Sequence, residues 1–397
     1  ARRGRNSLAA RVSRLSGSPV VSTATGTAAA ATTIAANAGG GETATVNTAV
    51  ATAPSVLVTD AGGNPVPGVA VTFAVTGGGG TISSPSGAVV TTNASGIAAL
   101  SSWVLGTTAG SNNNTVTATS GSLSGSPVTF TSSATAGVAS QISLSAGNNQ
   151  SATVGTAVTT DPAVLVRDAF NNPVSGVAVT STVTGGAGTT TAPTSGNSIN
   201  TDGSGLATIG SWTLGATAGT NTLAATVSGL SGSPVVFTAT GTAAAANSLA
   251  IFDGDAQTAT VGTAVAIAPS VRVLDIGGNP VAGTNILFAV TGGSGVISSP
   301  TGATITTNAS GIAALSSWVL GTTAGTNNNT VTATVSGGPL NGTLVTFTAN
   351  ATAGAASQIS LSAGNNQSAT VGTAVTTDPA VLVRDAFNNP VSGVAVT

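Results

Sequence analysis

The side chains best able to do chemistry in this sequence are its ten Asp and Glu residues, because it contains no His, Cys, Lys, Tyr or Met. Those absences remove the common general bases, thiol nucleophiles, Schiff-base lysines and soft metal ligands. A carboxylate pair, as in glycoside hydrolysis, is the remaining route to catalysis. Asp253 and Asp255 are close in sequence, but such a pair occurs in one place only, and we expect both to face solvent. We predict no enzyme and no catalytic residue.

An acidic residue recurs in four related boxes with the pattern D-x-x-x-N-P-V-x-G. Carboxylate and amide oxygens suit calcium, but one Asp per box supplies too few ligands. Asp and Asn also bond their own backbone in turns, so the boxes indicate structural turns. Calcium held between domains by Asp253 and Asp255 is the alternative that remains. We predict no metal-binding residue, no cofactor-binding residue and no cofactor. The boxes are Asp60–Gly68, Asp168–Gly176, Asp275–Gly283 and Asp385–Gly393.

Three tryptophans, the only ones in the sequence, share a Ser-Trp-x-Leu-Gly setting: Trp103, Trp212 and Trp318. Exposed Trp rings can serve as stacking platforms for sugars. A single Trp flanked by Leu and by Val or Thr in strand alternation is more typical of a core residue between two sheets. We therefore predict that all three are core residues.

These motifs recur because the chain is a tandem array, and its period sets the folding unit. The Asp residues of the boxes lie 108, 107 and 110 positions apart. Ala139–Thr180 recurs letter for letter as Ala356–Thr397, and Thr91–Gly110 recurs as Thr306–Gly325. The copies therefore alternate as types A, B, A and B, a pattern that duplication of a two-domain unit explains.

The repeats predict five segments. The sequence of Gly4–Thr27 is similar to that of Gly219–Thr242, near the end of a type B repeat. We therefore expect the chain to begin and end inside a repeat and to be a piece of a longer protein. The segments are the C-terminal fragment of a preceding repeat at 1–31, a type A repeat at 32–137, a type B repeat at 138–243, a type A repeat at 244–354, and the N-terminal part of a type B repeat at 355–397.

Short strands separated by turns fill each copy. Val164–Asp168 and Val177–Thr180 flank the Asn-Pro box as the strands of a hairpin do. Asn114–Thr119 alternates with period two, which places Val116 and Ala118 on one face. No stretch has a helical period. We predict an all-β fold, a tandem array of immunoglobulin-like antiparallel β-sandwich domains.

Composition narrows the classes of partner. Hydrophobic residues make up 41% and charged residues 5%, which suits folded β domains rather than a disordered tail. Residues 32–397 hold three Arg against all ten acids, so we predict no nucleic-acid binding. No run of 18 apolar residues occurs, so no membrane insertion is expected in this segment. The remaining five Arg gather near the start, which aligns with a repeat and is therefore interpreted as a repeat rather than a targeting arm: Arg2, Arg3, Arg5, Arg11 and Arg14.

The hairpin V-x-V-x-D-x-x-G-N-P-V-x-G-V-x-V, the T-[ND]-x-x-G turn, the Trp-bearing strand and the closing T-V-T-A-T strand resemble bacterial immunoglobulin-like domains of the invasin and intimin type (group 1). The resemblance covers residues 32–397 and the fragment before them. It implies a role as stalk in a surface adhesin and says little about a ligand. The sequence shows no lectin-like tip, outer-membrane barrel or peptidoglycan-binding module.

From these features we predict a non-catalytic extended stalk or spacer of a bacterial cell-surface or secreted adhesin-like protein, located outside the cell. Its partners would be neighbouring Ig-like domains of the same chain, and host-cell or matrix ligands bound through a distal module. The main alternative is a structural subunit of an extracellular filament or surface layer that self-associates through exposed strand edges. A third is an accessory array in a secreted polysaccharide-degrading enzyme or a phage fibre.

Overall fold

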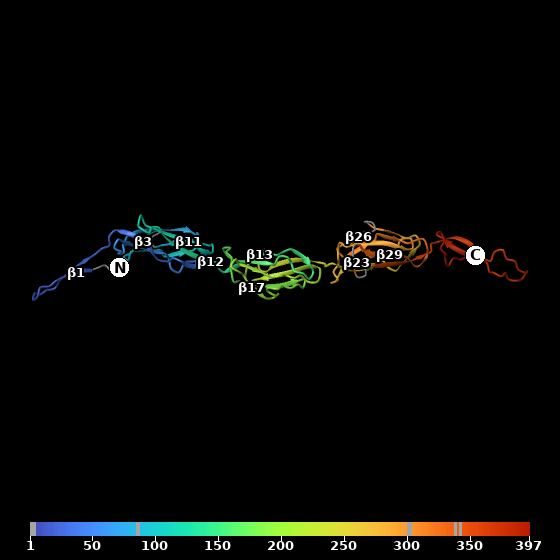
Figure 1. The fold of residues 1–397 in the computed structure, drawn as a ribbon, viewed down its shortest axis with the longest axis horizontal. Coiled ribbons are helices and arrows are strands. Elements are labelled where there is room, and N and C mark those ends of the chain that lie inside the picture. Colours follow the sequence, from blue (N-terminus) through green and yellow to red (C-terminus); the bar gives the residue numbers. More distant parts are fainter. Residues whose placement is uncertain (1–4, 85–87, 300–303, 337–339, 341–343) are drawn as a thin grey trace.

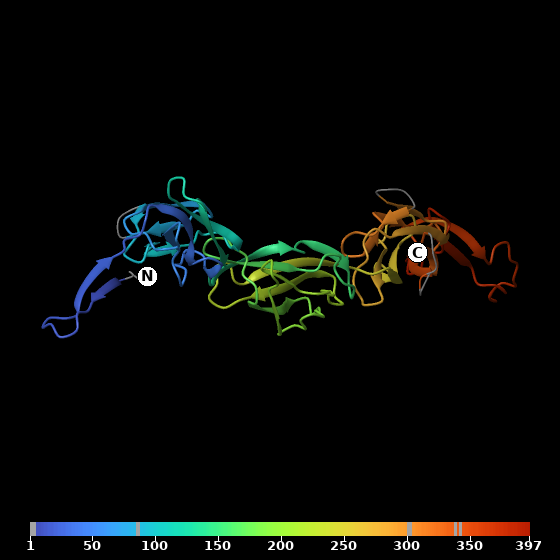
Figure 2. The same cartoon turned by 60° about the vertical axis from the view of Figure 1, so that its left-hand side comes forward.

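The chain forms a row of β-sheet units placed end to end (Figure 1). The computed structural model describes residues 5–84, 88–299, 304–336, 340 and 344–397. Three complete units lie between a short N-terminal hairpin and a partial C-terminal unit, and the same order is seen after a 60° turn (Figure 2). The described residues do not include Arg2 and Arg3 of the predicted N-terminal fragment, or Gly342 and Thr343 of the predicted repeat at 244–354. Within the described residues every regular element is a β-strand and none is a helix, which confirms the all-β prediction.

The first unit packs a three-stranded sheet, β3-β5-β9, against a five-stranded sheet, β4-β12-β11-β6-β8, with a short pair β7-β10 beside them. Neighbouring strands are antiparallel except β4 and β12, which run parallel. That single parallel pair departs from the predicted antiparallel sandwich. The strands are β3 (Ala31–Ala38), β4 (Glu42–Thr45), β5 (Ser55–Asp60), β6 (Ala70–Gly77), β7 (Thr81–Ser83), β8 (Val89–Thr91), β9 (Ile97–Ala99), β10 (Ser102–Val104), β11 (Gly110–Thr119) and β12 (Val128–Thr135).

The second unit repeats this plan with sheets β13-β15-β18 and β14-β20-β19-β16-β17. Its Trp212 lies outside a strand, unlike the predicted Trp-bearing strand. Ser211 beside it has a positive φ of 34°, and Thr213 forms only isolated bridges. The strands are β13 (Ala139–Ala146), β14 (Gln150–Thr153), β15 (Ala163–Asp168), β16 (Ala178–Gly185), β17 (Ser198–Asn200), β18 (Leu206–Thr208), β19 (Gly219–Thr226) and β20 (Val235–Thr242).

The third unit returns to the arrangement of the first, with sheets β21-β23-β27 and β22-β30-β29-β24-β26 and the pair β25-β28. Its strands are β21 (Ala246–Asp253), β22 (Gln257–Thr260), β23 (Ser270–Asp275), β24 (Asn285–Gly292), β25 (Val296–Ser298), β26 (Thr304–Thr306), β27 (Ile312–Ala314), β28 (Ser317–Val319), β29 (Gly325–Val335) and β30 (Leu344–Thr352).

Each complete unit has its own apolar core between its sheets. Trp103, Trp212 and Trp318 have no exposed surface, which confirms that they are core residues and rules out a sugar platform on their rings. Val116 and Ala118 are also fully buried, as the alternation along β11 predicts.

The two ends of the chain hold fewer strands than the three units between them. The N-terminal hairpin pairs β1 (Arg5–Ala10) with β2 (Val20–Thr25), and the C-terminal part pairs β31 (Ala356–Ala363) with β32 (Ala380–Asp385). Ile359 is 61% exposed, whereas Ile142 in the identical segment of the second unit is 3% exposed. The difference arises because the strands that cover Ile142 have no counterpart within residues 355–397.

Candidate functional site: the junctions between repeats

The Asp of each box organises a turn, as the sequence predicted. In the second unit, Oδ1 of Asp168 accepts hydrogen bonds from the backbone N–H groups of Phe170 at 2.8 Å and Asn172 at 2.9 Å. Its second oxygen has a different task, because Oδ2 accepts the backbone N–H of Gly137 at 2.8 Å. Gly137 belongs to the linker that enters the unit, so one carboxylate holds both the turn and the linker.

The bond from the linker recurs at every box. Oδ2 of Asp60 accepts the N–H of Ala29, Oδ2 of Asp275 that of Ala244, and Oδ2 of Asp385 that of Gly354, at 2.8–2.9 Å. In each case the donor precedes the first strand of the unit by two residues. The four linkers therefore leave the previous repeat along a path that a buried carboxylate fixes.

Hydrogen bonds keep these carboxylates ionised. Burial alone would raise the pKa of Asp168, Asp275 and Asp385, but bonds from the box Asn side chain, the linker N–H and the turn N–H groups outweigh it and lower the pKa. For Asp60, the bonds from the N–H groups of Asn64 and Ala29 lower the pKa most. The acceptors at the junctions are consequently anionic at neutral pH.

The Asn of the box reaches across the junction. Oδ1 of Asn172 accepts the N–H of Ala109 at 2.7 Å, and its Nδ2 donates to the carbonyl oxygen of Thr107 at 2.8 Å. Both partners belong to the first unit. Nδ2 also donates to Oδ2 of Asp168 at 2.9 Å, so the carboxylate that holds the linker also orients the amide that binds the preceding repeat.

The same pair of bonds is made at the next two junctions. Asn279 accepts the N–H of Ala218 at 2.8 Å and donates to the carbonyl of Ala216 at 3.0 Å. Asn389 accepts the N–H of Ala324 at 2.7 Å and donates to the carbonyl of Thr322 at 2.9 Å. We call the three segments that receive these bonds the junction loops: 107–109, 216–218 and 322–324.

The box Asn is buried where it binds a junction loop and exposed in the first box, which binds none. Asn172, Asn279 and Asn389 are 5–6% exposed, whereas Asn64 is an exposed residue. Asn64 keeps its bonds to Asp60, at 3.2 Å to each oxygen. The Asp–Asn pair of a box therefore forms even where no junction loop contacts it. The Asn is buried only where it contacts the preceding repeat.

Each junction loop is anchored just before it starts. The N–H of Gly106 donates to Oδ1 of Asn114 at 2.8 Å, and Asn114 is fully buried. A Cβ on Gly106 would lie 1.6 Å from the carbonyl oxygen of Gly78, so only glycine fits there. Gly215 with Asn221 and Gly321 with Asn329 repeat this arrangement.

Sequence reasoning missed the roles of these Asn residues. The available signal was an Asn that recurs six or eight positions after the Gly of Ser-Trp-x-Leu-Gly. The structure thus brings together two sequence motifs that were read separately, because the Trp motif ends at the loop that the Asn-Pro box of the next repeat binds.

The two acids considered for calcium lie in different settings. Oδ1 of Asp255 accepts the N–H and hydroxyl of Thr348, at 2.8 and 3.3 Å, and Oδ1 of Asp253 accepts the N–H of Gly254. Asn148 of the second unit bonds Thr238 in the same way as Asp255 bonds Thr348. Among the described residues, no group of three His, Cys, Asp or Glu is placed to hold a metal. The absence of metal and catalytic residues stays a prediction.

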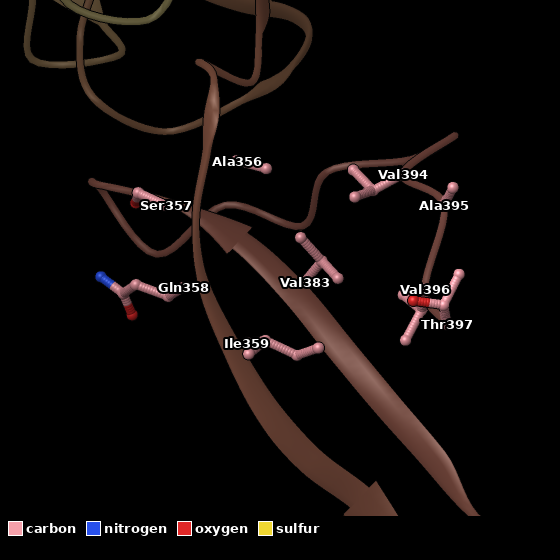
Figure 3. Close-up of a pocket in the computed structure, with 9 residues that line it drawn as sticks. All are labelled: Ala356, Ser357, Gln358, Ile359, Val383, Val394, Ala395, Val396 and Thr397. Carbon is pink, nitrogen blue, oxygen red and sulfur yellow. The ribbon is translucent and has the colours of Figure 1, made fainter.

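A hollow in the partial C-terminal unit lies between β31, β32 and the last residues (Figure 3). Its lining includes Ile359 and Val383, whose counterparts Ile142 and Val166 are buried in the core of the second unit. The hollow is therefore the uncovered core side of a sandwich rather than a built ligand site. No helix in the described part of the chain has the length and apolar character needed to cross a membrane.

Comparison with known proteins places part of the sequence in a family. Residues 50–131 match the bacterial Ig-like domain (group 1). No curated protein matches the sequence.

Solved structures with a similar fold include the Escherichia coli adhesin FdeC, with 20% identity over 81% of this chain and 99% of that one and a TM-score of 0.47. Invasin, a bacterial integrin-binding protein, has 19% identity over 83% of this chain and 60% of that one, with a TM-score of 0.41. The surface-layer protein SbsC, domains 1–6, has 14% identity over 95% of this chain and 46% of that one, with a TM-score of 0.30. The match to the bacterial Ig-like domain (group 1) covers residues 50–131, and the three complete units, which share one plan of sheets, make the chain a tandem array of immunoglobulin-like domains.

Proposed function

We propose that this chain is a non-catalytic, extended spacer in a bacterial cell-surface or secreted adhesin-like protein. The observation that carries the proposal is the repeated junction: each of three junctions joins consecutive units by two hydrogen bonds from one buried Asn. Bonds at these three junctions favour an open row of units over folding back, since domains joined by loose linkers move freely.

The surface chemistry supports the same role. Binding energy in protein interfaces comes mostly from Trp, Tyr and Arg anchors, and here Trp is buried, Tyr is absent and Arg is scarce. We propose that host-cell or matrix ligands are bound by a distal module outside these residues, and that the array displays it outside the cell. Nucleic acid is a poor partner, since residues 32–397 carry three Arg against ten acids.

Small-angle X-ray scattering of the full chain tests the spacer function. We expect a radius of gyration well above the about 21 Å of a compact chain of 397 residues. A value near that of a globule would overturn the proposal. Concentration-dependent growth into ordered fibres would instead favour the filament or surface-layer subunit.

A further inference from the structure

The junctions of this array are of two kinds, and they differ in one position of the box. Position three is Phe170 or Phe387 in the type B boxes and Gly277 in the type A box of the third unit. An A-to-B junction therefore offers an aromatic ring to the preceding repeat, and the B-to-A junction offers none at that position. The Asn bonds are present in both kinds.

At the junction that follows the third unit, the ring of Phe387 lies against the preceding repeat. Atoms Cζ and Cε2 of Phe387 lie 3.4 and 3.5 Å from the point where a Cβ on Gly262 would stand. Gly262 forms a turn in the third unit, and its N–H donates to the carbonyl of Gly321, directly before the junction loop. The ring of Phe387, which is 50% exposed, therefore lies against a turn that neighbours the Asn bonds. In the first unit Asn47 takes the place of Gly262, and its N–H donates to the carbonyl of Gly106.

The B-to-A junction leaves the corresponding turn open. Gly155 occupies the place of Gly262 in the second unit and bonds Gly215 in the same way, yet nothing lies within 4 Å of its Cβ position. Ile276, the apolar residue of the type A box at this junction, is 84% exposed and does not replace the ring. Phe170 in the type B box of the second unit is less exposed, at 42%.

From this difference we infer that the array is stiff at its A-to-B junctions and bends at its B-to-A junction, so that an A-B pair moves as one block. Two hydrogen bonds made by one side chain hold two units at a single point, about which they can rotate. A second, apolar contact beside that point opposes the rotation, because bending would expose more of the ring to water. The spacing of two repeats then sets the length of the rigid segment.

Nitroxide pairs on the full chain measure each junction separately, and the chain has no native Cys. Ser95, Ser204 and Ser310 occupy the same exposed turn in successive units. Ser95→Cys with Ser204→Cys spans an A-to-B junction, and Ser204→Cys with Ser310→Cys spans the B-to-A junction. We expect a broader distance distribution for the second pair in electron spin resonance.

Two exchanges identify the ring as the cause. Phe170→Ala should broaden the 95–204 distribution and leave the 204–310 distribution unchanged. Gly277→Phe, which copies the type B box, should narrow the 204–310 distribution. Circular dichroism confirms that each variant folds. Equal widths for the two junctions, or a 95–204 width unaffected by Phe170→Ala, would overturn the inference. The scattering test of the spacer function is independent, because a bent array is still extended.

Discussion

Oδ1 of Asn172 in the second unit accepts the backbone N–H of Ala109 in the first at 2.7 Å, across 63 positions of sequence. The amide that makes this bond is held by Asp168, whose carboxylate also holds the linker residue Gly137. One Asp and one Asn thereby define both the path of the chain between two repeats and the contact between them.

Replacing Asn172 with Ala should loosen the first junction. The change removes two part-buried hydrogen bonds, to the N–H of Ala109 and the carbonyl of Thr107, each of which contributes about 0.5–1.5 kcal/mol. Hydrogen–deuterium exchange should therefore quicken in the junction loop 107–109. Asn64→Ala is the matched control, since Asn64 bonds Asp60 but no preceding repeat. If Asn64→Ala quickened exchange in the segment before its own unit as much as Asn172→Ala quickens it in 107–109, the junction role of Asn172 would be contradicted.

Acid should weaken the junctions through the box carboxylates. Their pKa is lowered in the folded chain from the ordinary 3.8, so their contribution to stability is present above that pH and is lost as the pH falls below it. Calorimetric scans from pH 7 to pH 2 should show melting temperatures that fall in this acid range. Asp168→Asn should flatten that dependence for the second unit.

The control for Asp168→Asn is Asp202→Asn. This change places at the turn of the second unit the residue that the type A repeats have there, Asn93 and Asn308. Its Oδ1 accepts only the turn N–H groups of Ser204 and Leu206, which an amide oxygen also accepts. A loss of acid dependence in this variant equal to that in Asp168→Asn would show that junction carboxylates are not its source.

The sequence predicted those features that depend on neighbouring residues. The turn at Asp168 is local, and the burial of Trp103 follows from alternation along β10, so both predictions are confirmed. The bonds that build the junction join residues tens of positions apart, and no periodicity encodes them. Asn172 therefore looked like turn chemistry alone. Asn114 is the last of three adjacent Asn residues in the sequence, although it is the buried acceptor for Gly106.

Trp212→Ala should destabilise the second unit by about 3–5 kcal/mol, because the change removes a fully buried indole and leaves a cavity. Neighbouring units should change less, since contacts in a linear array are mostly local. Limited proteolysis of the full chain should cut first within residues 138–243. Uniform loss of stability across all units would argue that the array unfolds as one body.

Removal of divalent cations should leave the array unchanged. A bound ion would raise stability in proportion to RT ln(1 + [L]/Kd), so a chelator would lower the melting temperature if calcium held any junction. Calorimetry with and without chelator is the measurement. A fall of several degrees on chelation that Asp253→Ala abolished would place an ion beside β21.

The glycine ahead of each junction loop should be irreplaceable. In the second unit, a Cβ on Gly215 would stand 1.6 Å from the carbonyl oxygen of Gly186, so Gly215→Ala must displace backbone and the junction loop that follows. Gly203→Ala is the control within the same unit, because nothing lies within 4 Å of its Cβ position. We expect Gly215→Ala to lower the melting temperature of the second unit and to quicken exchange at Ala218, whose N–H donates to Asn279. If both alanine variants melted alike, the close approach of Gly215 to Gly186 would not be what fixes the loop that the third unit binds.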